Sequence, residues 1–426
     1  MAKYLSTPVA IRVNPAATPP SAAAPSWVAG ISKTQWSEIA ASPVFLDAVR
    51  ALSPPGPYKP GMSSAIGAVR DAYCDWTLDA DGHKVYLFGG GHVDGTWNGV
   101  VGFDFETLTY SLPVLPTTVY PPSYTHSGAA LRYPSGLQPA GFASAATILA
   151  NSANPGADLP YAAKADALVA SHTYGALVYL DGTMVRYYGA NAIADLVSGT
   201  WSGLTNDVVS RQLTTAPGGR PEYTTQSLAS GTVALVDAAR GHHWITMQDQ
   251  SGLNWRAGII KFNPTSQKVE QIYNFGAGFH ADATVVQANR YVYVLQTSFS
   301  NRHTLSFGWR LHMDTGVIER LRFSGSTMPY FDNGANIETM PAYFDGMRIR
   351  MWAYTTDRDA LYDIDPIPVS GAGTNASPYI LTVTRTSIPA TGMPHLAFTY
   401  KLHYLADWGV AVVNPRSSAK WWALRT

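Results

Sequence analysis

The sequence predicts an all-β fold, arranged as a single β-propeller of about six four-stranded blades. Three observations support this prediction. Glycine (37 residues) and proline (29 residues) are spread through the whole chain. Short strand-like runs recur, each closed by turn residues, and few stretches show the apolar period of a helix. The runs group into units spaced roughly 50–65 residues apart, which is typical of a propeller and too long for a short solenoid repeat.

The first unit shows the pattern most clearly. Asp79-Ala80-Asp81-Gly82 separates strands expected at 71–79 and 84–88, and two further strands follow at 98–105 and 108–112. Asp-Gly pairs favour the primed turns whose twist matches that of the flanking strands. We therefore expect a four-stranded antiparallel sheet here.

Five more units repeat this order with variation. Their strands are expected at 173–180, 184–189, 201–205 and 208–213; at 232–237, 242–248, 257–263 and 269–273; at 283–287, 291–296, 308–313 and 317–323; at 336–344, 347–354, 361–365 and 379–384; and at 396–405, 410–414 and 420–425.

The sixth unit contains only three strands before the sequence ends. We expect a strand from the N-terminal region to complete it, either 26–31 or 34–39, each of which carries a tryptophan. The propeller would then occupy residues 23–426, with an extended N-terminal arm at residues 1–22. Residues 113–170 form a long, proline-rich inter-blade loop or insertion, and loops of that length are usually functional.

Several segments resemble a known family. The stretch KVYLFGGGHVDGTWNGVVGFDFETLTY (84–110) looks like a kelch-type blade. Residues 171–182 and 398–425 are similar to segments of uncharacterised bacterial and phage proteins related to the central domain of galactose oxidase. The resemblance implies a kelch-like propeller over residues 26–426 and little about function. A structural role in tight strand-end packing is expected for Gly89, Gly90, Gly91 and Asn98.

Composition argues against several classes of protein. Lys+Arg and Asp+Glu are each 29, and charged residues make up only 14%. This balance lacks the basic excess that would attract nucleic acid or an anionic membrane. The single cysteine, Cys74, excludes a disulfide within the chain. We expect no signal peptide and no transmembrane segment, because the apolar runs are short and interrupted by proline.

The sequence bears on two enzymatic interpretations. A copper-radical oxidase, suggested by the resemblance, would require a Tyr-His pair, and the sequence contains none. A glycosidase needs two carboxylates that face one cleft. Asp71 and Asp75 are weak candidates for this role, and aspartates that satisfy loop hydrogen bonds are the more ordinary explanation. We predict no catalytic residues beyond these two, and no cofactor.

Three histidines are expected at the mouth of the central channel. His92, His172 and His280 each lie beside the end of a predicted inner strand or its loop. Histidine clusters bind transition metals, but histidines that hydrogen-bond to blade loops are commoner. We therefore predict no metal site.

Aromatic residues in loops give a stronger indication of binding. Tyrosine and tryptophan combine apolar area with a polar tip and are favoured at interfaces. The candidate ligand-binding residues are Tyr120, Tyr124, Tyr133, Tyr161 and Trp201, and the loops and edges are also expected to expose Trp408, Trp421 and Trp422. The alternative is that the tryptophans are wedged between blades.

These features together predict a non-enzymatic structural or adhesion module, a component of a bacteriophage virion such as a tail, fibre or capsid decoration. Residues 1–22 would anchor it to other virion or scaffold proteins, since an extended arm can add a strand to a neighbouring sheet. The loops would contact protein or host-surface glycan within an oligomeric assembly. The alternatives are a carbohydrate-binding or carbohydrate-active propeller enzyme and a bacterial kelch-like interaction scaffold.

Overall fold

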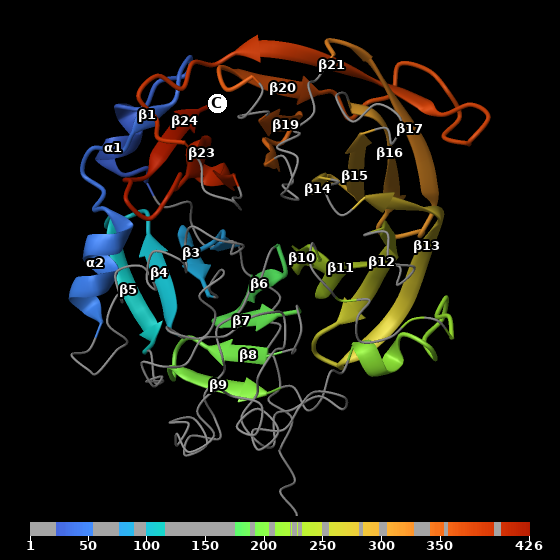
Figure 1. Cartoon of the computed structure of the whole chain (residues 1–426), viewed down its shortest axis with the longest axis horizontal. Coiled ribbons are helices and arrows are strands. Elements are labelled where there is room, and N and C mark those ends of the chain that lie inside the picture. The colour runs from blue at the N-terminus through green and yellow to red at the C-terminus, as the bar shows by residue number, and fades with distance from the viewer. Residues whose placement is uncertain are drawn as a thin grey trace, which may run out of the picture.

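A computed structural model describes most of the predicted strands. The described residues are 23–53, 76–88, 99–115, 175–187, 192–203, 209–221, 223, 228, 232–248, 255–280, 284–297, 305–327, 341–352, 357–395 and 402–426. They form a mostly-β structure of small antiparallel sheets, which are consistent with propeller blades (Figure 1).

The described strands make six four-stranded units, numbered here in chain order. Units one to three contain β2 (Trp76–Asp79), β3 (Lys84–Leu87), β4 (Val100–Asp104) and β5 (Thr109–Val114); β6 (Leu177–Leu180), β7 (Thr183–Arg186), β8 (Ala192–Asp195) and β9 (Thr200–Gly203); and β10 (Ala234–Asp237), β11 (His242–Gln248), β12 (Trp255–Asn263) and β13 (Lys268–His280).

Units four to six follow the same plan. They contain β14 (Thr284–Ala288), β15 (Tyr291–Thr297), β16 (Leu305–His312) and β17 (Ile318–Gly325); β18 (Ala342–Phe344), β19 (Ile349–Trp352), β20 (Ala360–Ile364) and β21 (Tyr379–Ser387); and β22 (His403–Leu405), β23 (Val410–Val413), β24 (Trp422–Arg425) and β1 (Ser37–Glu38).

The units pack against one another in a ring. Buried apolar side chains form six clusters, and each cluster combines residues from two neighbouring units. The sixth cluster joins unit six to unit one, where the ring centroids of Trp76 and Trp421 lie 5.3 Å apart. Every unit therefore buries apolar side chains on both sides, which is how a ring of small sheets obtains a core.

An N-terminal strand completes unit six. β1 pairs antiparallel with β24, with Ser37 opposite Ala423 and Glu38 opposite Trp422. This confirms that the last unit is closed by an N-terminal strand, and it selects the 34–39 candidate. Residues 26–31 do not form a strand. Ser26–Ala29 make the single-turn helix α1, and Trp27 from this helix packs on Trp408.

Two features differ from the sequence prediction. The outer strands of unit two are β8 and β9, whereas strands were expected at 201–205 and 208–213. The Asp195 carboxylate accepts hydrogen bonds from the backbone N–H groups of Val197 and Ser198, so the chain turns earlier than expected. In addition, β17 and β21 pair in parallel and join units four and five into one eight-stranded sheet.

Other segments cover outer strands of the ring. Helix α2 (Phe45–Leu52) packs beside β5, because Phe45 contacts the rings of Trp76 and Tyr110. The segment 209–221 lies along β13, where the backbone N–H of Ile272 donates to Pro217 O at 2.8 Å. Such coverage protects exposed strand edges from pairing with other chains. Among the described residues, none of the helices is long and apolar enough to cross a membrane.

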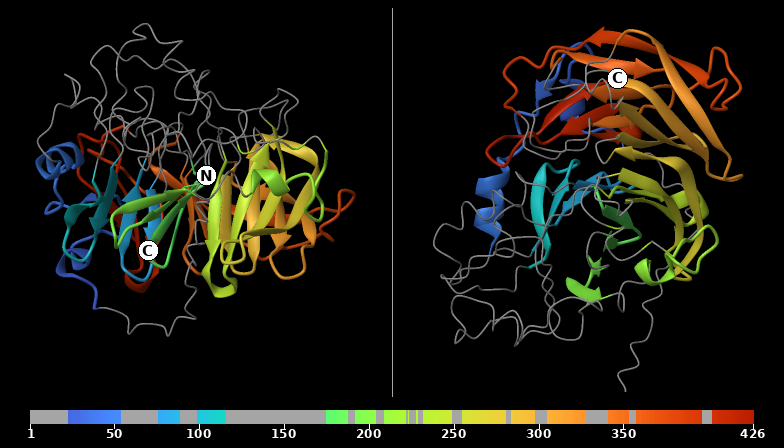
Figure 2. Two further views of the ribbon diagram at one scale, coloured as in Figure 1. Left: turned by 90° about the horizontal axis from the view of Figure 1, so that it is seen from below. Right: turned by 45° about the vertical axis from the view of Figure 1, so that its right-hand side comes forward.

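The ring has two distinct ends (Figure 2). At one end, short turns join the first strand of each unit to the second, and the third strand to the fourth in units one to four. In unit five, the longer link 365–378 joins the third strand to the fourth at this end, which we call the hairpin end. The opposite end carries the links from the second strand of each unit to the third, and it also carries the links from one unit to the next. We call this the connection end.

Candidate functional site

The first strands of the six units line a cavity on the axis of the ring. Its volume is about 310 Å³, and each of β2, β6, β10, β14, β18 and β22 contributes residues to its wall. A concave site to which several elements contribute is the default location for a ligand. The convergence of all six units makes this cavity, with the connection end above it, the candidate functional site.

Strand alternation decides how the wall is built. In β14, Val285 packs towards unit three and Val286 towards unit five, because successive side chains point to opposite faces. The lining is consequently mostly aliphatic. Its polar side chains are those of Thr77, Thr284, Gln287 and His403. A mostly aliphatic cavity of this volume suits a small molecule or ordered water better than a polymer.

Most of the predicted site residues lie outside the described part of the chain. This holds for Asp71, Asp75, His92, His172, Tyr120, Tyr124, Tyr133, Tyr161, Gly89, Gly90, Gly91 and Asn98. Trp201 lies in β9 and His280 ends β13, but their side chains are also outside it. Each of these predictions therefore stays a prediction.

The strand order nevertheless fixes where the predicted segments leave the ring. Residues 89–98 follow β3, residues 116–174 follow β5, and Asp71 and Asp75 precede β2. The described strand ends that flank these segments all lie at the connection end. Most of the candidates for ligand contact are thus attached at the same end of the ring.

The C-terminal tryptophans are buried, contrary to the expectation that they are exposed in loops and edges. Trp421 is fully buried and stacks on Phe103, and its indole N–H donates to the Tyr110 hydroxyl at 2.9 Å. Trp408 and Trp422 are buried as well. The alternative interpretation is confirmed for these three residues, because each packs in a cluster between two units.

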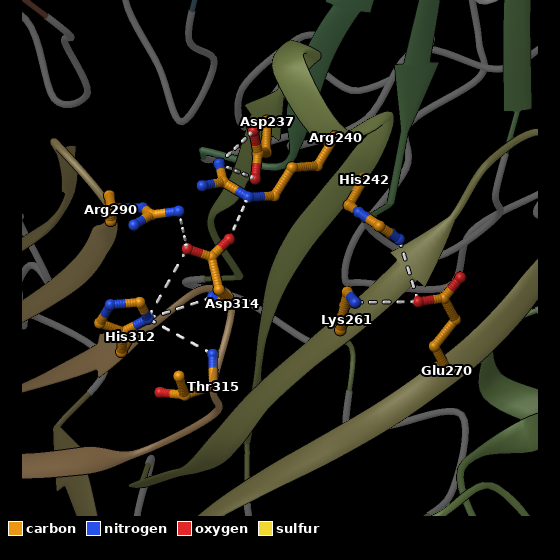
Figure 3. Close-up of polar contacts among 9 residues, drawn as sticks. All are labelled: Asp237, Arg240, His242, Lys261, Glu270, Arg290, His312, Asp314 and Thr315. Atoms are coloured by element: carbon orange, nitrogen blue, oxygen red, sulfur yellow. Dashed lines mark hydrogen bonds and ion pairs between the residues drawn. The ribbon is translucent and has the colours of Figure 1, made fainter.

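A network of charged side chains crosses the hairpin end between units three and four (Figure 3). The Asp314 carboxylate accepts from Arg240 Nε at 2.5 Å and lies 2.7 Å from Arg290 Nη2. Arg240 also donates to Asp237, at 3.0 Å and 3.1 Å. The hydrogen bond from Arg240 lowers the pKa of Asp314.

A second group in Figure 3 lies on unit three alone. Glu270 is 2.9 Å from His242 Nε2 and 3.0 Å from Lys261 Nζ. Partial burial acts to raise the pKa of Glu270, but its contacts with Lys261 and Asn263 outweigh burial and lower it. The acids and bases of both groups are paired with one another, so this arrangement suits a structural role.

Another polar contact joins unit one to unit six. His83 is buried and stacks on Trp408, with ring centroids 4.0 Å apart. Its Nδ1 lies 3.1 Å from Glu106 Oε1, and its Nε2 lies 3.4 Å from Asp407 Oδ2. The latter contact is within ion-pair range but lacks hydrogen-bond geometry. Sequence patterns do not indicate these pairs, because the partners are far apart in the chain.

Burial changes the acidity of a carboxyl group between units one and two. The Asp79 carboxylate accepts from the Gly82 N–H at 3.0 Å, which confirms that Asp79–Gly82 forms a hairpin turn. Burial raises the pKa of Asp79, and it raises the pKa of the nearby Tyr86 to about 12. Tyr86 also stacks on Tyr179 of unit two. Within the described part of the chain, no group of three or more metal-ligating side chains is assembled.

Comparisons with known proteins bear on the fold only. No family model matches the chain, and no curated protein matches it. Among solved structures, the chain is similar to a gluconolactonase from Xanthomonas campestris that is important in glucose secondary metabolic pathways. The sequence identity is 10%, the match covers 88% of this chain and 99% of that chain, and the TM-score is 0.40. The chain is also similar to YjhT, with 8% identity over 83% and 93% of the two chains and a TM-score of 0.38. Both are β-propeller proteins. Because the sequence identities are so low, neither protein's activity can be assigned to this chain.

Proposed function

We propose that the chain is a single six-bladed, kelch-like propeller that serves as a non-enzymatic structural and adhesion module. In this proposal the ring is a rigid platform, and the segments at its connection end contact a protein or glycan. Closure of the ring carries the proposal: β1 pairs with β24, and the cluster between units six and one completes the core. Binding residues are disproportionately found on loops that a rigid scaffold positions.

The aromatic candidates add support from the sequence. Tyr120, Tyr124, Tyr133 and Tyr161 belong to the segment that links β5 to β6, whose flanking strand ends lie at the connection end. Aromatic rings provide a large contact area at low entropic cost, and sugar rings stack on them. We therefore propose a glycan or a protein surface as the partner.

The biological setting that we propose is a bacteriophage virion. Residues 1–22 would anchor the module to other virion or scaffold proteins within an oligomeric assembly. This part of the proposal rests on the sequence resemblance and on the arm's extended, proline-containing composition. Its test is deletion of residues 1–22, which should abolish incorporation into particles while the circular-dichroism spectrum and melting temperature of the ring are retained.

Retention on host-surface polysaccharide, measured together with the release of new reducing ends, tests the adhesion function. We expect retention without release. We also expect retention to fall when Tyr120, Tyr124, Tyr133 and Tyr161 are replaced by alanine. Val197→Ala, at the hairpin end, is the control and should bind as the parent does. Release of reducing ends would instead support the carbohydrate-active enzyme, and Asp71→Asn and Asp75→Asn would then be tested for loss of turnover.

A further inference from the structure

Large apolar side chains are exposed at the hairpin end. Val197, Val317, Met347, Ile367 and Val369 expose between 52% and 88% of their surface. The first three lie in turns of units two, four and five, and the last two lie in the link 365–378 of unit five. Elsewhere in the described part of the chain, large apolar side chains are exposed only at Leu52 and Leu115. Exposed apolar groups gathered at one end of a molecule indicate an interaction surface.

The turns hold most of these side chains in fixed positions. In four cases, the backbone N–H of the apolar residue donates to a side chain two positions earlier. The pairs are Val197 with Asp195 at 2.9 Å, Met347 with Asp345 at 2.8 Å, Ile367 with Asp365 at 2.9 Å and Val317 with Thr315 at 3.4 Å. Because the backbone is already ordered, little conformational entropy is lost when a partner binds there.

The hairpin end is also acidic. Its turns and links, together with the strand ends next to them, contain eleven carboxylates and six Lys or Arg residues, although the whole chain has no net charge. The carboxylates belong to Asp79, Asp81, Asp104, Glu106, Asp181, Asp195, Asp237, Asp314, Asp345, Asp365 and Asp407, and the bases are Lys84, Arg240, Lys268, Arg290, Arg348 and Arg425. Two such faces would repel each other, so this end favours a basic, apolar partner over a second copy of itself.

The chain contains a segment with these properties. Residues 1–22 include Lys3 and Arg12 but no Asp or Glu, and their apolar residues are concentrated between Tyr4 and Val13. The described chain begins beside the hairpin end, because the indole N–H of Trp27 donates to Phe105 O at 2.8 Å. Twenty-two extended residues span up to roughly 70 Å, which is ample to cross the end of a ring of this size.

We propose that, in the free chain, residues 1–22 lie across the hairpin end of their own ring. Their apolar side chains would cover Met347 and Ile367, and Lys3 and Arg12 would lie among the carboxylates. Tethering favours the chain's own arm, because a short linker gives an effective concentration in the millimolar range. This inference concerns the free chain and does not rest on the function proposed above.

Trypsin cleavage after Arg12 in the full-length protein tests the proposal. The cleavage rate should be on the order of tenfold below that of a synthetic peptide of residues 1–22, the ratio expected for a modest docking free energy. Met347→Asp combined with Ile367→Asp should restore fast cleavage, and so should high salt, which screens surface charges. Leu115→Asp is the matched control at a distant exposed apolar residue and should retain the protection.

Two outcomes would overturn the proposal. The first is cleavage of the arm at the rate of the free peptide in all the variants. The second is protection that appears only as the protein concentration rises, because the arm would then bind another copy. Melting temperatures of all the variants show whether the ring is intact. The substituted side chains are exposed, so the melting temperatures should be unchanged.

Discussion

The imidazole of His83 lies flat on the indole of Trp408, with an interplanar angle of 16°, and this contact links the first unit of the ring to the last. His83 has a left-handed backbone, with φ at 49°. The corresponding turns of units three and six have glycine there, Gly241 and Gly409, with φ of 65° and 62°. Unit one therefore tolerates an unfavourable backbone conformation, and the buried side-chain contacts offset its cost.

This relationship predicts a difference between two substitutions. His83→Ala should reduce the free energy of unfolding by about 2 kcal/mol, because it loses the stacking and the polar contacts but keeps the unfavourable φ. His83→Gly should be about 1 kcal/mol more stable than His83→Ala, because glycine adopts this conformation without strain. Urea unfolding of both variants measures the difference. Equal stabilities would show that the backbone conformation is not costly.

The burial of His243 leads us to expect that the protein loses stability in acid. Burial lowers its pKa to about 3, and Tyr187 Oη lies 2.5 Å from its Nδ1. The unfolded chain takes up this proton near pH 6.5 and the folded chain only near pH 3. The stabilisation is therefore complete above pH 6.5 and is lost progressively as the pH falls towards 3.

The pH dependence of unfolding provides the test. His243→Gln should reduce the slope of the unfolding free energy between pH 6 and pH 4 by up to about 1.4 kcal/mol per pH unit, the contribution of one proton. The control is His395→Gln at an exposed position, which should leave the slope unchanged. An unchanged slope in His243→Gln would show that another group accounts for the acid sensitivity.

The burial of Trp36 leads us to expect that this side chain contributes strongly to holding the N-terminal segment on the ring. Its ring stacks on Trp352 of unit five, with centroids 4.7 Å apart, and it is almost fully buried just before β1. Trp36→Ala should cost about 3–5 kcal/mol, which is typical of removing a buried tryptophan. Leu115→Ala, at an exposed position, should change stability by less than about 0.5 kcal/mol. Thermal unfolding compares the two variants.

Asp314 predicts a contribution that depends on salt and pH. Its pKa is lowered, so its ion pairs stabilise the fold above the ordinary carboxyl pKa, and this stabilisation is lost as the pH falls through the lowered value. Asp314→Asn should destabilise the protein at pH 7 in low salt and have less effect in 1 M salt, where such pairs are screened. Urea unfolding at pH 7 and pH 3 measures both dependences. A cost that is equal at pH 3 would contradict the ion-pair explanation.

Local sequence signals predicted much of the fold. Asp181-Gly182 forms the expected tight turn, with φ of 46° and 78° and with Leu180 paired to Thr183. The strands of units one, three and four also lie close to their predicted positions, because turn residues separate the apolar runs there. In unit two, the short run Ala192–Asp195 carries little strand propensity, and its strand was missed.

Contacts between distant residues were not predictable in the same way. The parallel pairing of β17 with β21 joins two outer strands whose individual patterns give no sign of each other. Likewise, neither Arg240 nor Asp314 is unusual within its own turn, and the pair exists only because units three and four are neighbours. The first strands around the axial cavity were predictable, but the side chains that line it depend on how the six units are rotated.

The pairing of Ser37 with Ala423 also has a consequence for biosynthesis. A ribosome releases residue 37 long before residue 423 exists, so unit six cannot be completed until β24 has been translated. Closing so long a loop is slow compared with forming a local hairpin. Trp36, which directly precedes β1, therefore cannot be buried between units five and six until the residues that separate β1 from β24 have been made.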